Sequence, residues 1–169
     1  PIAILDSLRF GEPSSARSRY LLEHAVAGIG HYGNAIGIAT VGGEIYFEGP
    51  YETNCLVNAM CVGLIETDRL IRSAAAGVGN ILVLFGARTG RDGIGGASVL
   101  ASAELDEGDA AKRPSVQIGD PFEEKKLLEC SLELLEHSLL VALQDLGAAG
   151  LTSSSSEMAA KGGLVALTH

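Results

Sequence analysis

The 169-residue sequence predicts an α+β fold in which helices and a sheet form mixed layers. Short apolar runs at residues 2–5, 56–65 and 81–85 are typical of buried strands. Two longer stretches instead repeat their apolar side chains every three or four residues, as amphipathic helices do. Several of the expected strands are interrupted by glycine, which favours mixed layers over a doubly wound sheet.

The first helix is expected soon after the strand at residues 2–5. Either Ser14 or Ser15 can cap its amino end. Apolar side chains then recur every four positions, at Leu21, Ala25 and Ile29. Three glycines between residues 28 and 33 predict that the helix ends near Ala27, because glycine disfavours a helix interior.

The stretch from residue 34 to residue 85 is expected to hold three strands and one short helix. Glycines punctuate its first part, and the later apolar runs carry almost no charge. The predicted strands are 44–47, 56–65 and 81–85, and the predicted helix is 66–75.

A second long helix has the clearest start signal in the chain. Asp120 can cap it, Pro121 suits its first position, and Glu123 can complete a capping box. Leucines then follow at helical spacing and predict a stripe that faces the core, at Leu128, Leu132, Leu135 and Leu139.

Asp145 is the strongest single candidate for chemistry. We expect it at the end of a buried strand over residues 139–144, before a tight loop at 147–150 and a helix at 152–160. A rigid carboxylate beside the N–H groups of a helix start suits Mg²⁺ that bridges a polyphosphate. The competing interpretation is an aspartate that only caps the next helix. The run Ser153–Ser156 is interpreted as helix N-terminal capping rather than as a phosphorylation site.

The charge balance limits the partners of the chain. Its net charge is −9 and its pI is about 4.8, which disfavours nucleic acid and anionic membranes as partners. A nucleotide could still bind through Mg²⁺ or backbone N–H groups. The cysteines lack the spacing of a zinc or disulfide framework, so we expect buried thiols and a cytoplasmic protein. They are Cys55, Cys61 and Cys130.

Two glycine-rich motifs carry less information. Residues 28–33 match GxGxxG, but a helix is expected before them, so we interpret them as a helix C-terminal turn and reject a dinucleotide site. The loop at 86–97 contains no lysine and is therefore not a Walker phosphate loop. It either directs backbone N–H groups at an anion near Arg91 or is a plain tight connection. His24 and His137 are expected on helix surfaces.

Both ends of the chain lie in apolar runs. The sequence starts at Pro1, directly before the run at 2–5, and it stops within the run at 164–167. Because domains seldom begin and end inside core strands, we expect an internal segment of a longer protein.

Six sequence blocks, spread over nearly the whole chain, resemble successive motifs of one family. That family is the synthetase subunit of formylglycinamide ribonucleotide amidotransferase, also called phosphoribosylformylglycinamidine synthase. The blocks occur in the family's order and lie at residues 5–11, 37–44, 58–63, 90–97, 117–122 and 144–151. The chain departs from the family at Ala39 and Cys55, where proline is common, and this affects local rigidity more than chemistry.

The resemblance implies the fold of the aminoimidazole ribonucleotide synthetase superfamily. Residues 1–76 would be the end of its N-terminal α+β domain, and residues 77–169 the start of its C-terminal domain. It also implies a reaction: formylglycinamide ribonucleotide, ATP and glutamine-derived ammonia give the amidine, ADP and phosphate. Mg²⁺ would be the cofactor, and the partners would be a glutaminase subunit or domain and, in the small bacterial form, a third small subunit.

Two residues carry over from the family's motifs. Gln117 matches a glutamine that contacts the substrate, and Asp145 matches an aspartate that binds magnesium. The family's catalytic histidines, its ATP-contacting lysine and its other magnesium carboxylates match no segment of this chain. We therefore expect no catalytic residue here, and an isolated chain that is inactive.

Two other functions remain open from the sequence. One is another ATP-dependent synthetase or kinase of the same superfamily, which would share the fold and a Mg–ATP cleft. The other is a non-catalytic scaffold half, because internal duplication in the family leaves one nucleotide site structural. Retention of Gln117 and Asp145 argues against the scaffold.

Overall fold

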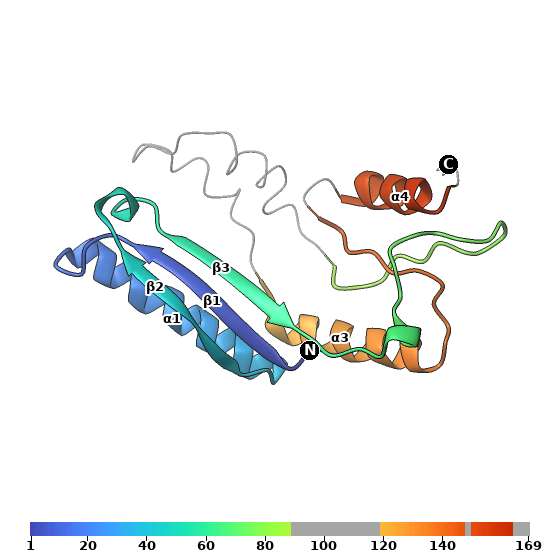
Figure 1. Ribbon diagram of the computed structural model, residues 1–169, viewed down its shortest axis with the longest axis horizontal. Coiled ribbons are helices and arrows are strands. Elements are labelled where there is room, and N and C mark those ends of the chain that lie inside the picture. The colour runs from blue at the N-terminus through green and yellow to red at the C-terminus, as the bar shows by residue number, and fades with distance from the viewer. Residues whose placement is uncertain (89–118, 148–149, 164–169) are drawn as a thin grey trace. The chain divides into compact units, whose positions relative to one another are not determined.

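The computed structural model describes residues 1–88, 119–147 and 150–163. The chain divides into two compact units, Pro1–Asp68 and Arg69–His169, which are considered separately below. The first unit is a three-stranded sheet with a long helix, and the described residues of the second unit form two helices and several irregular segments (Figure 1). This mixture of helices and sheet is the α+β architecture that the sequence predicts.

The sheet of the first unit has the order β2-β1-β3, so β1 lies in the middle. β1 (Ala3–Phe10) pairs in parallel with β2 (Thr40–Phe47) and antiparallel with β3 (Leu56–Val62). The parallel pair needs a crossover, and α1 (Ala16–Ile36) provides it. All three strands were predicted, but β1 and β2 are longer than expected because the two neighbours hydrogen-bond to the whole length of β1.

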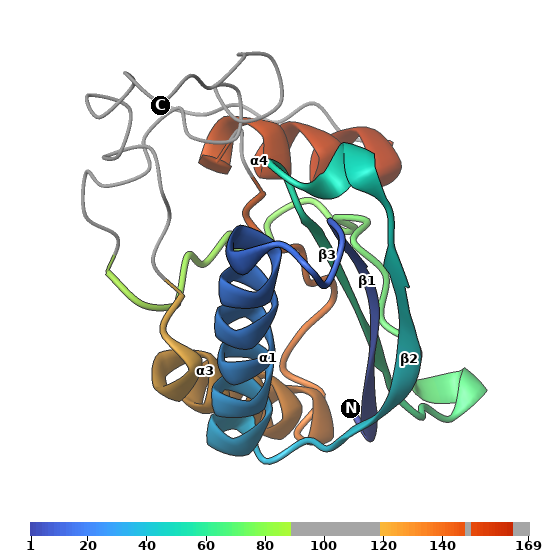
Figure 2. The ribbon, with the colours of Figure 1, turned by 90° about the vertical axis from the view of Figure 1, so that its left-hand side faces the viewer.

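Alternate residues of β1 point toward α1, which covers one face of the sheet (Figure 2). Leu8 and Phe10 are buried on this face, and Phe10 is completely inaccessible. Ile36 and Ile38, at the end of α1 and just after it, are also buried. β3 was predicted to be buried, and this is wrong for the described chain, since most of its side chains are exposed.

The helix α1 begins where the sequence predicts and ends later. The Ser15 hydroxyl accepts a hydrogen bond from the Ser18 amide at 3.3 Å, which makes Ser15 the N-cap. The predicted end near Ala27 is wrong, because the helix continues through residues 28–33 to Ile36. Gly37 ends it in the left-handed conformation, with φ 74°. The GxGxxG residues therefore lie inside a helix, not in the turn after one.

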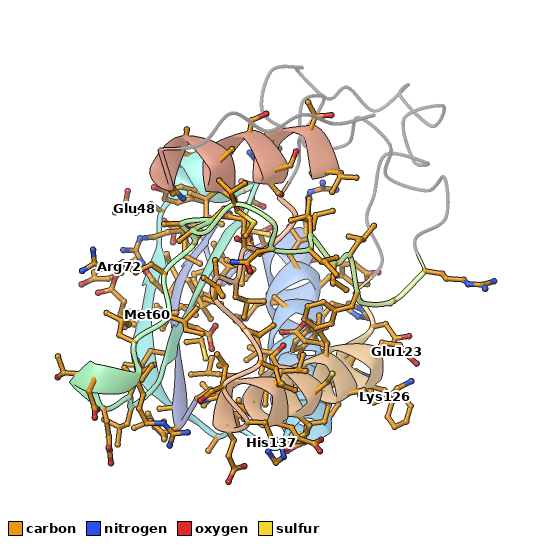
Figure 3. All side chains as sticks on the ribbon, turned by 90° about the vertical axis from the view of Figure 1, so that its right-hand side faces the viewer. Glu48, Met60, Arg72, Glu123, Lys126 and His137 are labelled. Atoms are coloured by element: carbon orange, nitrogen blue, oxygen red, sulfur yellow. The ribbon has the colours of Figure 1, made fainter. Side chains whose placement is uncertain are left out.

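In the second unit, α3 (Pro121–Glu136) starts as predicted. The Asp120 carboxylate accepts hydrogen bonds from the amides of Phe122 and Glu123, each at 3.1 Å. The Glu123 side chain pairs with Lys126 at 2.6 Å, and both lie near the first turn of α3 (Figure 3). The predicted leucine stripe has exposed members at Leu132 and Leu139, so this face is less covered than expected.

Three other elements predicted after residue 65 differ from the structure. The helix expected at 66–75 is a single 3₁₀ turn, η2 (Thr67–Arg69). The segments 81–85 and 139–144, expected as buried strands, are irregular, because no described strand lies beside them to supply hydrogen bonds. The expected helix at 152–160 is present as α4 (Gly150–Lys161).

Candidate functional site

Asp145 lies in an irregular segment that two hydrogen bonds fix to its surroundings. Two residues before it, the Leu143 amide donates to the Arg72 carbonyl at 3.4 Å; Arg72 is labelled in Figure 3. The Asp145 carbonyl accepts from the Ser154 hydroxyl at 2.9 Å. The segment around Asp145 is therefore contacted by α4 and by residue 72 rather than by a neighbouring strand.

The serine run 153–156 has a different role from the predicted capping. Ser154 and Ser155 are buried inside α4, and their hydroxyls donate to backbone carbonyls of the preceding turn. Ser154 also makes the contact with Asp145 described above. The prediction of N-terminal capping is wrong, because the helix already begins at Gly150, in a left-handed conformation with φ 64°.

The Asp145 carboxylate is exposed and receives a hydrogen bond from the side-chain amide of Gln144, whose Nε2 lies 3.2 Å from Oδ1. Within residues 1–88, 119–147 and 150–163, no group of three or more His, Cys, Asp or Glu side chains could hold a metal ion. An exposed carboxylate still fits Mg²⁺, which proteins commonly bind through one or two carboxylates plus phosphate oxygens and water. Asp145 could therefore supply one ligand of such a site.

The other residues that the sequence singled out add no side chain to the surroundings of Asp145. Gln117 lies outside the described residues, as do Arg91 and most of the glycine-rich loop at 86–97. His24 and His137 are exposed, as predicted, and the His24 ring packs against Tyr20 with 4.2 Å between centroids. The cysteines correct a prediction: all three are free thiols, but Cys61 and Cys130 are exposed and Cys55 is half-buried.

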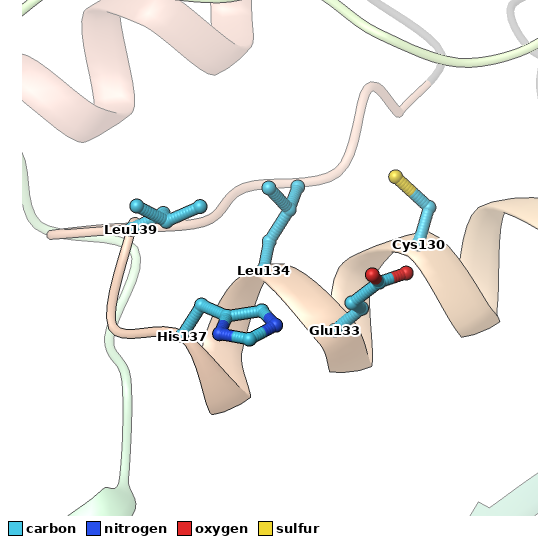
Figure 4. A pocket seen from close by; sticks show the side chains of 5 residues that line it. All are labelled: Cys130, Glu133, Leu134, His137 and Leu139. Atoms are coloured by element: carbon cyan, nitrogen blue, oxygen red, sulfur yellow. The ribbon is translucent and has the colours of Figure 1, made fainter.

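A small pocket of about 250 Å³ lies along α3 and the residues after it. Figure 4 shows that the Cys130 thiol and the His137 imidazole lie apart in it, with Glu133 between them. Asp145 is not among its lining residues. The pocket therefore adds no group to the Asp145 site.

Sequence reasoning missed a buried carboxylate at Asp6. This side chain of β1 is only 7% exposed, and neither of its oxygens has a hydrogen-bond partner within the part of the chain that the structure describes. It borders a hollow of about 410 Å³, with Val26 and Ile29 of α1 among the other lining residues. The sequence does hold one signal of this burial: side chains two residues apart on a strand face the same side, so Asp6 shares the face of Leu8 and Phe10.

The opposite face of the sheet carries an ion pair. The Arg9 guanidinium lies 2.6 Å from Glu44 Oε1 and 4.4 Å from the centre of the Tyr46 ring. The Ser7 hydroxyl also donates to Glu44, at 2.9 Å. Hydrogen bonds from Arg9 and then Ser7 lower the pKa of Glu44 below its ordinary value. These residues are register partners on β1 and β2, so the pairing itself brings them together.

Glu52 connects the turn after β2 to the start of α1. Its carboxylate accepts from the Ser18 hydroxyl at 2.9 Å. Hydrogen bonding from the hydroxyls of Ser15 and then Ser18 lowers the pKa of Glu52. Glycine is needed at position 11, because a Cβ there would lie 2.5 Å from the Cα of Glu52, a backbone atom.

Both parts of the chain match a known protein family. Residues 1–65 match the family described as AIR synthase related protein, N-terminal domain, and residues 77–167 match the C-terminal domain of the same family. Together these matches cover most of the chain. In the described residues, no helix is both long and apolar enough to cross a membrane.

Relatives and solved structures agree with this match. The chain is 62% identical over 164 residues to the phosphoribosylformylglycinamidine synthase subunit PurL of Thermoanaerobacter sp. (strain X514), covering 97% of this chain and 22% of the relative. The subunit PurL of Gloeobacter violaceus is 58% identical, with 97% and 21% covered. The chain thus spans about a fifth of the length of these curated relatives.

Two solved structures of T. maritima PurL resemble the fold. The complex with FGAR has a TM-score of 0.82 and 45% identity, covering 96% of this chain and 25% of that one. The complex with ATP has a TM-score of 0.75 and 39% identity, covering 96% and 23%.

The fold and the two family matches define a segment of an AIR synthase-like α+β protein. The chain belongs to the AIR synthase related protein family, and it matches both the N-terminal and the C-terminal domain of that family.

Proposed function

We propose that the chain is part of an ATP-dependent C–N ligase that makes formylglycinamidine ribonucleotide in purine biosynthesis. The observation that carries this proposal is the 62% identity, over 97% of the chain, to a phosphoribosylformylglycinamidine synthase subunit. The resemblance to T. maritima PurL structures complexed with FGAR and with ATP supports the two substrates.

The proposed reaction addresses a chemical obstacle. The carbonyl oxygen of the substrate amide that becomes the amidine is a poor leaving group, so ammonia cannot displace it directly. Transfer of the ATP γ-phosphoryl group to that oxygen gives an iminophosphate and ADP. Ammonia then attacks the carbon, and phosphate leaves with the oxygen.

Asp145 is proposed as one magnesium ligand. Its side chain is exposed, its backbone is held by Ser154, and its Oδ1 is oriented by Gln144. Bound Mg²⁺ would offset charge on the transferring phosphoryl group. Gln117 is proposed to contact the substrate, because a side-chain amide can both donate to and accept from an amide or a ribose hydroxyl.

The proposed partners are a glutaminase subunit or domain and a small third subunit. A structure described as PurLQS from T. maritima, which is 39% identical over 96% of this chain, supports this assembly. We also propose a cytoplasmic location, supported by the free thiols at Cys55, Cys61 and Cys130.

The proposed domain boundary follows residue 76, with 1–76 and 77–169 on its two sides. It is supported by family matches that stop at residue 65 and resume at residue 77. The compact units change slightly earlier, between Asp68 and Arg69. The residues between these positions would form the connection.

The test is turnover of the full-length protein that carries this chain, with FGAR, ATP and ammonia. Asp145→Asn is expected to lower kcat roughly 100-fold or more, since it removes a ligand of the Mg²⁺ ion that would stabilise negative charge in the transition state. Glu136→Gln, an exposed acid of α3, is the matched control and should leave turnover unchanged. Unchanged turnover in Asp145→Asn contradicts the metal role.

Isothermal titration separates this function from a scaffold role. In a scaffold, Asp145→Ala would not change Mg²⁺-dependent binding of ATP or FGAR by the full-length protein. In the proposed ligase, the same variant weakens that binding. The 169-residue chain alone is expected to show no turnover with FGAR, ATP and ammonia, and normal turnover would contradict the proposal.

A further inference from the structure

One chain of hydrogen bonds joins the end of α4 to the proposed magnesium ligand. The Lys161 ammonium, in the last turn of α4, donates to the Gln144 carbonyl oxygen Oε1 at 3.3 Å. The Nε2 of the same Gln144 amide donates to Asp145 Oδ1 at 3.2 Å. A side-chain amide has one accepting and one donating end, so Lys161 selects the orientation in which Gln144 donates to Asp145.

The Lys161 ammonium is itself held from several directions. It donates to the Ser73 hydroxyl at 2.8 Å and lies 3.5 Å from Glu157 Oε2, one turn earlier in α4. With Gln144, these make three acceptors for an ammonium that has three N–H donors. The geometry at Nζ is therefore better defined than for a lysine with a single surface partner.

Backbone contacts place the residues of this series of hydrogen bonds next to one another. The Ala75 amide donates to the Met158 carbonyl of α4 at 2.9 Å. A Cβ at Gly162 would lie 1.5 Å from the Ala75 carbonyl oxygen, so glycine is needed for this approach. Ser154 holds the Asp145 carbonyl from the other end of the helix. Both ends of α4 thus anchor the segments that contribute Ser73, Gln144 and Asp145.

We propose that Lys161 and Gln144 are positioning residues that hold the Asp145 carboxylate in the orientation needed to bind Mg²⁺. This inference rests on the proposed magnesium role of Asp145 and adds two residues to it. Groups that hydrogen-bond to a metal ligand typically change metal affinity about 10- to 100-fold when they are removed. Because Lys161 is exposed and Gln144 is only half-buried, the lower end of that range, roughly tenfold, is expected.

The sign of the effect separates positioning from simple electrostatics. Lys161 is positively charged and repels a divalent cation, so removal of its charge alone would tighten cation binding. The positioning role predicts the opposite, since a freed Gln144 amide can turn its oxygen toward Asp145. Weaker cation binding in Lys161→Met is therefore a specific signature of the hydrogen-bond chain.

The experiment measures Mn²⁺ binding, by electron paramagnetic resonance of the free ion, to the full-length protein with AMPPCP present. Asp145→Asn defines the relevant sites as those it removes. At these sites, Lys161→Met and Gln144→Met are each expected to weaken binding roughly tenfold. The double variant should be no weaker than either single one, because both break the same chain. Circular dichroism checks that every variant keeps its helical content.

Glu157→Gln is the matched control. It removes the ion pair within α4 but leaves the Lys161–Gln144 hydrogen bond, so Mn²⁺ binding is expected to stay the same. If Asp145→Asn removes no Mn²⁺ site, the magnesium role itself fails and this inference fails with it. If Asp145→Asn removes a site but Lys161→Met leaves its affinity unchanged or tightens it, only the positioning role is overturned.

Discussion

Gly43 offers the most direct test of how the sheet is built. β1 and β2 change register between Ile4 and Leu5, and Gly43 then pairs with Asp6. At Gly43, φ is 148°, a conformation that residues with a side chain rarely adopt. A Cβ there would lie 2.0 Å from the Asp6 carbonyl oxygen and 2.9 Å from the Asp6 nitrogen. Both obstacles are backbone atoms of the central strand, which cannot rotate away.

The cost of Gly43→Ala follows from these two effects. The strained backbone costs about 1–3 kcal/mol, and overpacking against a fixed neighbour costs about 1–3 kcal/mol more. We therefore expect the free energy of unfolding to fall by about 2–6 kcal/mol, a large share of the roughly 5–15 kcal/mol typical of a domain.

The matched control is the preceding residue. A Cβ at Gly42 would meet no atom within 4 Å, so Gly42→Ala should change stability by less than about 0.5 kcal/mol. Urea unfolding followed by circular dichroism compares the two variants. Equal unfolding free energies for Gly43→Ala and Gly42→Ala would refute the close approach of β2 to β1.

Three further predictions concern charged side chains. Arg9 lowers the pKa of Glu44, so the ion pair stabilises the fold at pH values above the ordinary carboxyl pKa of 4.5, and this stabilisation is lost as the pH falls through the lowered pKa. Glu44→Gln should therefore make the free energy of unfolding less sensitive to acid. An unchanged pH profile of unfolding would count against the pair. Asp120→Ala should lower the free energy of unfolding by about 1 kcal/mol through loss of the N-cap of α3. Glu124→Ala, at an exposed neighbouring position, should lower this free energy by less. Asp6→Val should raise the unfolding free energy by roughly 1–3 kcal/mol, because it removes buried oxygens that lack described partners, and a loss of stability would mean that Asp6 has a partner outside the described residues.

The sequence predicted the features that depend on neighbouring residues in the chain. The caps at Ser15 and Asp120 were correct, because a capping side chain bonds to amides two or three positions away. The strands beginning near residues 2, 44 and 56 were also found, since apolar runs report burial or pairing.

The errors come from interactions between distant segments. Three glycines suggested an early end for α1, yet the helix continues to Ile36, whose side chain is buried. The apolar runs at 81–85 and 139–144 suggested strands, but a strand requires a partner, and none is present among the described residues. The lone acid Asp6 was missed because its burial depends on the later helix α1.

For the candidate site, the sequence singled out Asp145, whose magnesium role stays a prediction, but it did not indicate what holds this residue. Its position before the turn at 147–150 was visible in the sequence, whereas the roles of Ser154, Gln144 and Lys161 depend on how α4 folds back. Sequence spacing alone does not show that Ser73 shares a lysine with residue 144. The assignment of Gln117 stays a prediction.

The most direct measurement is a crystal structure of the full-length protein with Mg²⁺, AMPPCP and FGAR. The account predicts an Asp145 carboxylate oxygen about 2.0–2.1 Å from a magnesium ion that also contacts phosphate oxygens. A magnesium ion bound to the nucleotide with Asp145 outside its coordination shell would contradict the account.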